Sequence, residues 1–172
     1  MLRFIGALLL MAGSIGIGWS MRIGLKENLE HLYQMRQIFW MLQKEIEYSK
    51  APLPEACRKI GDKVEEPYRG AFFAIREEMI ANYGTDFPTL WKRQMEKCMK
   101  EVPVAAEDKR IFLAFGNCIG YMDGAVQAQA VEQYIHKLER AIERQEKNIA
   151  DKCKVIMSLS IMGGLMLVVI LL

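Results

Sequence analysis

The side chains in this chain best suited to chemistry are two histidines and a few neighbouring carboxylates. Glu132 and His136 stand four residues apart, about one helical turn, so both could ligate the same metal ion. They offer only two ligands, and a surface ion pair is the simpler interpretation. Glu65-Glu66 and Glu77-Glu78 are adjacent pairs, and adjacent positions on a helix point in different directions. Neither pair therefore converges for acid–base catalysis.

Sequence motifs of common enzymes are absent. The chain has no G-x-x-x-x-G-K-S/T phosphate loop, no H-E-x-x-H zinc pair and no G-x-S-x-G nucleophile elbow. We therefore predict a protein that is not an enzyme and has no catalytic, cofactor-binding or metal-binding residues. The four cysteines lack C-x-x-C spacing, which indicates reduced core residues rather than a zinc site or a disulfide framework: Cys57, Cys98, Cys118 and Cys153.

Charged residues are balanced in sign and concentrated in the middle of the chain. The net charge of the 172 residues is only +2, and both signs are mixed between Arg22 and Lys154. A nucleic-acid-binding surface needs a patch of one sign, so we predict no nucleic-acid binding. Four basic residues midway along the chain are a candidate partner surface, although a solvated face interleaved with acids is the simpler interpretation: Arg58, Lys63, Arg69 and Arg93.

Both ends of the chain are apolar. Residues 4–20 carry no charge and would form a helix of roughly 25 Å, enough to cross a hydrocarbon core. We predict an N-terminal transmembrane anchor (1–21), a helical bundle (22–154) and a C-terminal transmembrane helix (155–172). A cleaved signal peptide is the alternative for the first segment. Lysines and arginines flank the middle portion, which places the bundle in the cytoplasm and both termini outside it.

Prolines and glycines divide the middle portion into six predicted helices. The first helix covers about residues 22–48, and Pro52 with Pro54 opens the second. Pro67 starts the third helix, Thr85 or Asp86 caps the fourth, and Pro103 begins the fifth. The apolar residues recur at steps of three and four. We predict an all-α, six-helix antiparallel bundle flanked by two transmembrane helices, whose last bundle helix continues into the C-terminal span.

The apolar rows predict which side chains face the core. The first helix contributes Leu25, Leu29, Leu32, Phe39, Leu42 and Ile46, and the fourth contributes Phe87, Trp91, Met95, Cys98 and Val102. The fifth helix contributes Ile111, Phe115, Cys118 and Met122. Trp40 is also predicted to be a bundle residue.

Three segments carry a resemblance to a known family. They are residues 46–60 (IEYSKAPLPEACRKI), residues 82–91 (NYGTDFPTLW) and residues 113–127 (LAFGNCIGYMDGAVQ), followed by a charged helix leading into the C-terminal span. In this order and spacing, the chain resembles the stage III sporulation protein AB family of endospore-forming bacteria over its whole length. More distantly, the soluble part resembles one six-helix domain of the inner-membrane platform protein of type II secretion and type IV pilus systems.

The residues that match the platform signature fall in three places. They are Pro52, Leu53, Glu55 and Ala56 after the first helix, Gly84 and Thr85 in mid-domain, and Gly116, Gly120 and Asp123 near the last pair of helices. The chain departs from the platform family at Asn117, where that family usually has a glutamate. The platform family also carries two such domains and three spans.

The resemblance implies a two-pass protein of the mother-cell membrane facing the forespore, within the channel that connects the two cells. The implied partners are a cytoplasmic secretion-type ATPase of the same system, other channel subunits, membrane lipids and further copies of the chain. The residues agree with a non-enzymatic docking platform, because they offer a helical domain without catalytic groups. The alternative is a membrane-anchored helical sensor or regulator that responds to a small ligand, which a converged polar cluster in a concave pocket would favour.

Overall fold

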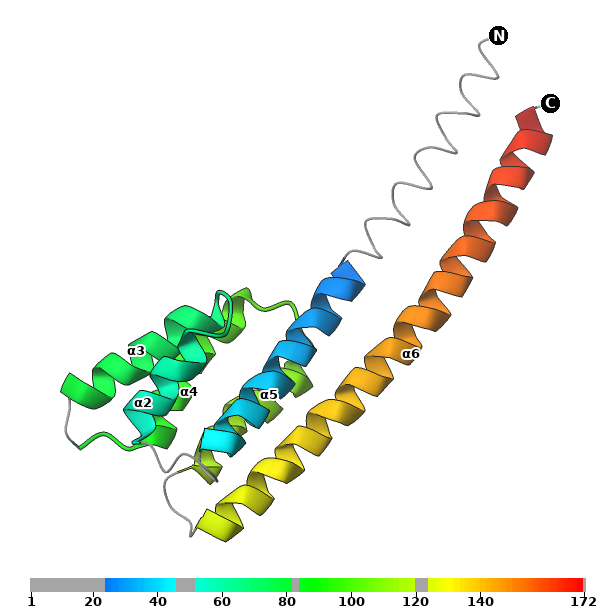
Figure 1. Cartoon of the computed structure of the whole chain (residues 1–172). Coiled ribbons are helices and arrows are strands. Elements are labelled where there is room, and N and C mark those ends of the chain that lie inside the picture. The colour runs from blue at the N-terminus through cyan, green and yellow to red at the C-terminus, as the bar shows by residue number, and fades with distance from the viewer. Residues whose placement is uncertain (1–23, 46–51, 82–83, 120–123, 172) are drawn as a thin grey trace. The chain divides into compact units, whose positions relative to one another are not determined.

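The computed structural model describes residues 24–45, 52–81, 84–119 and 124–171. These described residues form six α-helices, one 3-10 helix and no strand, which confirms the all-α class (Figure 1). The elements are a leading helix (residues 24–45), α2 (Leu53–Gly61), α3 (Tyr68–Ala81), α4 (Phe87–Glu101), α5 (Ala106–Ala114), the 3-10 helix η2 (Phe115–Cys118) and α6 (Gly124–Leu171).

The starts of α2 and α4 follow the predicted prolines and caps. Pro52 is the N-cap residue of α2 and Pro54 lies in its first turn, where the missing N–H costs no hydrogen bond. Before α4, the side chain of Asp86 accepts a hydrogen bond from the backbone N–H of Thr89 at 3.3 Å. Asp86 is therefore the N-cap of α4.

Aromatic side chains from several helices form the centre of the core. Phe39 of the leading helix stacks on Phe115, with ring centroids 3.9 Å apart. The Trp91 ring lies 5.3 Å from that of Phe112 and 5.4 Å from that of Phe115. All four side chains are fully buried. Each such ring pair contributes about 0.5–1.5 kcal/mol beyond the burial of its area, so this cluster ties the leading helix, α4, α5 and η2 together.

The predicted inward row of α4 is confirmed, since Phe87, Trp91, Met95, Cys98 and Val102 are all buried. The row predicted for the leading helix is too narrow. Leu32, Phe39 and Leu42 are buried as predicted, but so are Met35, Ile38 and Met41, whereas Leu25 and Leu29 are only half-buried. Ile46 lies outside the described residues.

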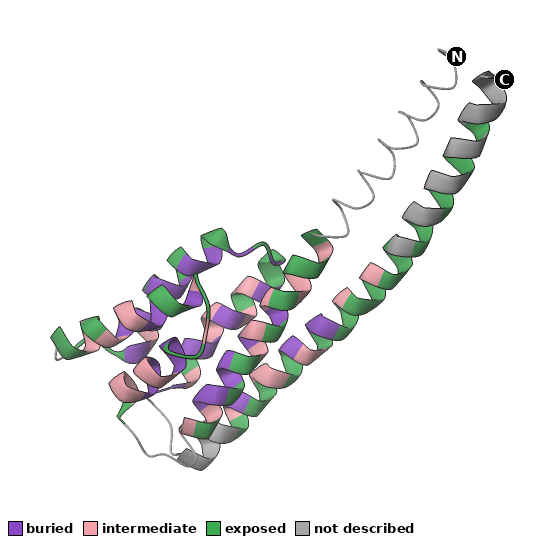
Figure 2. Cartoon of the chain, turned by 45° about the horizontal axis from the view of Figure 1, so that its top comes forward, coloured by how far each residue is buried: buried purple, intermediate pink, exposed green. Residues whose placement is uncertain are grey.

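The wider apolar stripe has a physical cause, because the leading helix meets several elements of the bundle. Phe39 contacts Phe115 of η2 and, edge-on, Tyr134 of α6, and Glu45 forms an ion pair with Lys59 of α2. Trp40 of the same helix keeps 50% of its surface exposed. Trp40, predicted to be a bundle residue, therefore lies on a helix of the bundle but at its surface. Figure 2 shows the buried residues of the neighbouring helices in purple.

The fifth helix is shorter than predicted. The α-helix ends at Ala114, and the chain tightens into the 3-10 turn of η2 instead of continuing to Met122. The indole N–H of Trp91 donates a hydrogen bond to the Phe112 carbonyl at 3.1 Å, just before this change. Phe115 is fully buried as predicted and Cys118 is half-buried, but at the start of the row Phe112 is fully buried and Ile111 only half-buried. Met122 lies outside the described residues.

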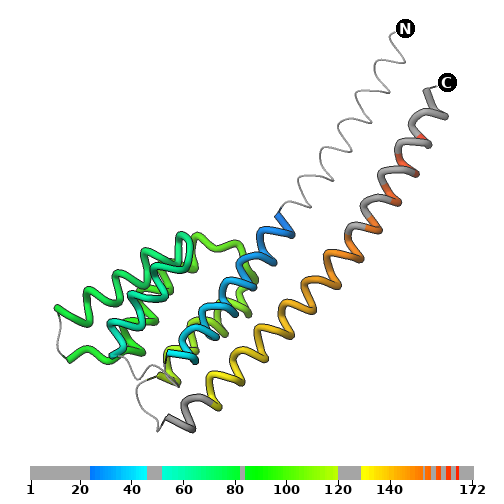
Figure 3. Tube along the Cα trace, in the orientation of Figure 1, coloured from blue at the N-terminus to red at the C-terminus, as the bar shows by residue number. Residues whose placement is uncertain are grey.

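The last helix, α6, is uninterrupted over 48 residues, which confirms the predicted continuity from the bundle into the C-terminal segment (Figure 3). The chain divides into two compact units, one covering Glu30–Ile142 and the other combining the two ends, Met1–Leu29 and Glu143–Leu172. Among the residues that the structure describes, no helix is long and apolar enough to cross a membrane. The predicted N-terminal anchor, residues 1–21, lies outside the described residues.

Candidate partner-binding surface

Arg58 of α2, the first residue of the predicted basic surface, is already paired within its own segment. Its Nη2 lies 2.7 Å from Oε1 of Glu55, and its Nη1 lies 2.9 Å from Oδ2 of Asp62. The hydrogen bond from the Arg58 guanidinium lowers the pKa of the Glu55 carboxyl. These side chains are exposed to solvent, so the pairs add little to stability, but they compensate the charge of Arg58 locally.

The other three basic residues fall on neighbouring elements of the same part of the bundle. Arg93 of α4 pairs with Glu78 of α3, so its charge is compensated as well. Lys63 lies in the turn after α2 and Arg69 on α3, and both are exposed. Within the described residues neither Lys63 nor Arg69 makes an ion pair, and the Arg69 guanidinium carbon lies 5.9 Å from the centroid of the Phe73 ring. These two residues therefore carry the available positive charge of the predicted surface.

His136 lies on α6 between two carboxylates. Its Nε2 is 3.9 Å from Oε1 of Glu132, and its Nδ1 is 2.9 Å from Oε2 of Glu139. The two ring nitrogens face different carboxylates and all three side chains are exposed, as expected for a surface ion pair rather than a metal site. No group of three or more potential metal ligands occurs in the described parts of the chain.

Cys57 and Cys98 are reduced and buried, as predicted. Burial raises the pKa of each thiol to about 12. Because the thiolate is the reactive species, at pH 8 both should react with Ellman's reagent about a thousandfold more slowly than a thiol of ordinary pKa. Site-resolved mass spectrometry after timed labelling measures this, and the urea-unfolded protein is the control. Rapid labelling of either cysteine in the native protein would contradict its place in the core.

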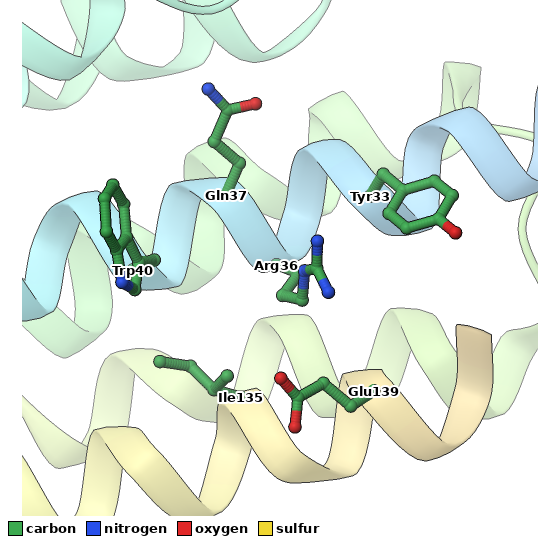
Figure 4. A pocket seen from close by; sticks show the side chains of 6 residues that line it. All are labelled: Tyr33, Arg36, Gln37, Trp40, Ile135 and Glu139. Carbon is green, nitrogen blue, oxygen red and sulfur yellow. The ribbon is translucent and has the colours of Figure 1, made fainter. Parts of the chain in front are cut away.

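A groove that we did not predict lies between the leading helix and α6, within the unit Glu30–Ile142 (Figure 4). It has a volume of about 440 Å³ and is lined by Tyr33, Arg36, Gln37, Trp40, Ile135 and Glu139. Four of these residues lie on the leading helix, where Arg36 and Gln37 each stand three or four positions from both Tyr33 and Trp40, which places the four on one side of the helix. That spacing is visible in the sequence, but the two residues from α6 are about a hundred positions away.

Comparison with known proteins identifies the family. The family model of stage III sporulation protein AB matches residues 3–172. The chain belongs to the stage III sporulation protein AB family. Stage III sporulation protein AB of Bacillus subtilis (strain 168) is 24% identical over 172 residues, with 99% of each chain covered. A solved structure of a stage III sporulation protein AB has the same fold, with a TM-score of 0.66 at 20% identity, and the match covers 72% of this chain and 97% of that one.

In this member of the stage III sporulation protein AB family, several signature residues have structural roles. Pro52 and Leu53 set the start of α2, and Ala56 is buried in it. Gly84 has a φ of 144°, a backbone conformation that residues with a Cβ rarely adopt. Thr85 follows it in the connection to α4. Gly120 and Asp123 lie outside the described residues.

Gly116 is the signature residue with the tightest surroundings. A Cβ built on it would lie 2.4 Å from Cδ1 of Trp91, so only glycine allows the indole to approach the backbone of η2. In this family member, the signature glycine therefore serves the packing of the core.

Proposed function

We propose that this chain is a non-enzymatic, membrane-anchored platform component of the channel between mother cell and forespore. Membership of the stage III sporulation protein AB family over residues 3–172 is the observation that carries this proposal. The bundle docks a cytoplasmic secretion-type ATPase, together with other channel subunits and further copies of the chain. The chain itself has no phosphate loop, and it neither binds nor hydrolyses ATP.

The membrane-anchoring part of the proposal rests on the sequence. Residues 155–172 contain no charged side chain, and a helix of this length extends about 27 Å, close to the thickness of a hydrocarbon core. The large exposed side chains described on this segment are apolar: Val155, Leu159, Met162 and Met166. Water solvates such a stripe poorly, whereas lipid hydrocarbon would cover it. The uncharged residues 4–20 supply the second anchor of a two-pass protein with a cytoplasmic bundle.

The topology is tested with cysteines introduced one at a time, in a background where Cys118 and Cys153 are replaced by serine. A cysteine at Lys92, which is exposed on α4, should react with a membrane-impermeant maleimide only after the cells are permeabilised. A cysteine added after Leu172 should react in intact cells. Labelling of the Lys92 position in intact cells would contradict the cytoplasmic placement.

The docking face proposed for the ATPase lies on α2 to α4 and comprises Arg58, Lys63, Arg69 and Arg93. Lys63 and Arg69 supply most of its attraction for an acidic partner, because Arg58 and Arg93 already pair with carboxylates of the chain. Charges at the rim of an interface act chiefly on the rate of encounter, and salt screens them.

Charge reversal of the docking face tests this assignment. Replacing both Lys63 and Arg69 with glutamate should slow association of the purified ATPase about tenfold at low salt, with a smaller effect at high salt. Binding is measured by interferometry with the full-length protein in mild detergent, and circular dichroism checks the fold. Arg110→Glu, a reversal of an exposed charge on α5, is the matched control and should leave association unchanged.

Two results would count against the proposal. Unchanged binding of the double variant would remove the docking face from the interface. If the unaltered full-length protein fails to bind an ATPase shown to be folded, the platform role itself fails and the sensor alternative gains support.

A further inference from the structure

The groove between the leading helix and α6 combines aromatic surface with a positive charge. Tyr33 is 37% exposed and Trp40 is 50% exposed, so two large rings at the border of the groove keep part of their surface open to solvent. The ammonium of Lys44 lies 3.6 Å from the centroid of the Trp40 ring and adds a second positive charge beside it. Arg36 lies between them, one helical turn from each. Figure 4 shows these side chains on the leading helix, across the groove from Ile135 and Glu139 of α6. Tyrosine, tryptophan and arginine are the side chains most enriched at the energetic centres of protein interfaces.

The positive charge of Arg36 is not neutralised by an acid in the described part of the chain. Its guanidinium carbon lies 5.2 Å from the centroid of the Tyr33 ring, and no ion pair is formed there. Glu139, on the opposite wall, directs Oε2 to Nδ1 of His136 at 2.9 Å. The groove therefore presents a cation flanked by apolar rings, which is complementary to an apolar side chain with a carboxylate one helical turn away.

The C-terminal end of α3 carries that combination. Ile80 is 47% exposed. Among the described residues of the unit Glu30–Ile142, the other large apolar side chains with comparable exposure are Tyr33 and Trp40, which line the groove. Glu77 precedes Ile80 by three residues, which places the two on one face of α3, and it is exposed as well. Glu78 pairs with Arg93, whereas Glu77 makes no ion pair in the described residues.

We infer that the groove of one copy of this chain binds the end of α3 of a second copy. Ile80 packs against Trp40 of the neighbouring copy, and Glu77 pairs with Arg36. The spacings agree, because Arg36 and Trp40 are separated by one helical turn, as are Glu77 and Ile80. A second copy is the occupant that the observations favour, since the same bundle supplies both complementary surfaces.

Such a contact is heterologous, because two different surfaces of the chain meet. In a pair of copies, one copy keeps its α3 end unoccupied and the other keeps its groove unoccupied, so further copies add until a ring closes or an open chain grows. The contact is small, so confinement to one membrane would raise its occupancy by raising the effective concentration of copies. The inference deepens the proposed platform and rests on its self-association, but the groove, on the leading helix and α6, contains none of the docking-face residues.

Charge reversal with rescue tests the contact in the full-length protein in mild detergent. We expect the unaltered protein to self-associate in a concentration-dependent way in analytical ultracentrifugation. Arg36→Glu alone or Glu77→Arg alone should weaken this self-association by about tenfold or more, because each substitution places like charges opposite one another. The double variant with both reversals should recover most of the lost affinity. Trp40→Ala should also weaken self-association, whereas Arg110→Glu is the matched charge control and should leave it unchanged.

The inferred contact between copies is contradicted if the unaltered protein stays monomeric at about 100 μM, a concentration at which weak specific contacts are detectable. It is equally overturned if the double variant fails to recover. If Arg36→Glu removes a channel subunit from the purified complex while the unaltered chain remains monomeric, the groove serves a foreign acidic segment instead. ATPase binding is measured on the same variants. It should be unaffected by Arg36→Glu, so a failure of self-association is distinguishable from a failure of the platform role.

Discussion

Replacing Gly116 with alanine should destabilise the bundle by about 3 kcal/mol, the upper end of what overpacking costs. The added Cβ would lie 2.4 Å from Cδ1, 2.7 Å from Cγ and 2.9 Å from Cβ of Trp91. Trp91 cannot easily give way, because it is fully buried and its indole N–H donates to the Phe112 carbonyl at 3.1 Å. Thermal unfolding followed by circular dichroism should show a midpoint lower by roughly 10 °C.

Gly70→Ala is the control for this substitution. Gly70 is exposed on α3, and the nearest atom to an added Cβ is the flexible Glu66 carboxylate, 3.2 Å away. This replacement should be neutral or slightly stabilising, because alanine favours a helix over glycine by about 1 kcal/mol. Equal effects of the two substitutions would show that the backbone preference of glycine, and not the approach of Trp91, decides the stability at Gly116.

Replacing Phe115 with alanine should cost about 4 kcal/mol, because it removes a ring from the centre of the aromatic core. Phe115 is fully buried, and its ring centroid lies 3.9 Å from that of Phe39, 5.4 Å from that of Trp91 and 5.8 Å from that of Tyr134. The cavity would lie among side chains that belong to the leading helix, α4 and α6, so neighbouring groups could fill it only in part. Denaturant unfolding at equilibrium measures the change in free energy.

The matched control for Phe115→Ala removes an aromatic ring from the surface of the same bundle. Trp40→Ala should cost less than about 1 kcal/mol, because half of that side chain is already exposed. An unchanged free energy of unfolding in Phe115→Ala would mean that η2 does not contribute its first residue to the core.

The helical class and most helix boundaries could be predicted because they depend on local chemistry. Pro52 and Pro54 open α2 and Asp86 caps α4, in each case through effects within a few residues. The inward row of α4 could also be predicted, since its apolar residues recur with the helical period and so mark one face of the helix. The change from α5 to η2 could not be predicted from the sequence, because it accompanies contacts of Trp91 with Phe112 and Gly116, which lie more than twenty positions away in the chain.

The partner surface shows the same division between local and distant contacts. The pairing of Arg58 with Glu55 and Asp62 follows from helical spacing and is readable in the sequence. The pairing of Arg93 with Glu78 crosses between two helices, so the sequence did not reveal that this charge is compensated. The groove was missed because the exposure of Trp40 depends on which neighbours the leading helix meets, and helical periodicity alone does not specify them.

The platform role is tested most directly by isolating the protein from sporulating cells. The full-length chain, tagged and expressed at its natural level, is purified from membranes in mild detergent, and the co-purifying proteins are identified by mass spectrometry. We expect to identify a cytoplasmic secretion-type ATPase and other membrane subunits of the same complex. Recovery of the ATPase should fall when Lys63 and Arg69 are both replaced with glutamate, and it should be unchanged in Arg110→Glu. Recovery of the chain from sporulating membranes without the ATPase, although that ATPase is present and folded in the same cells, would contradict the platform role.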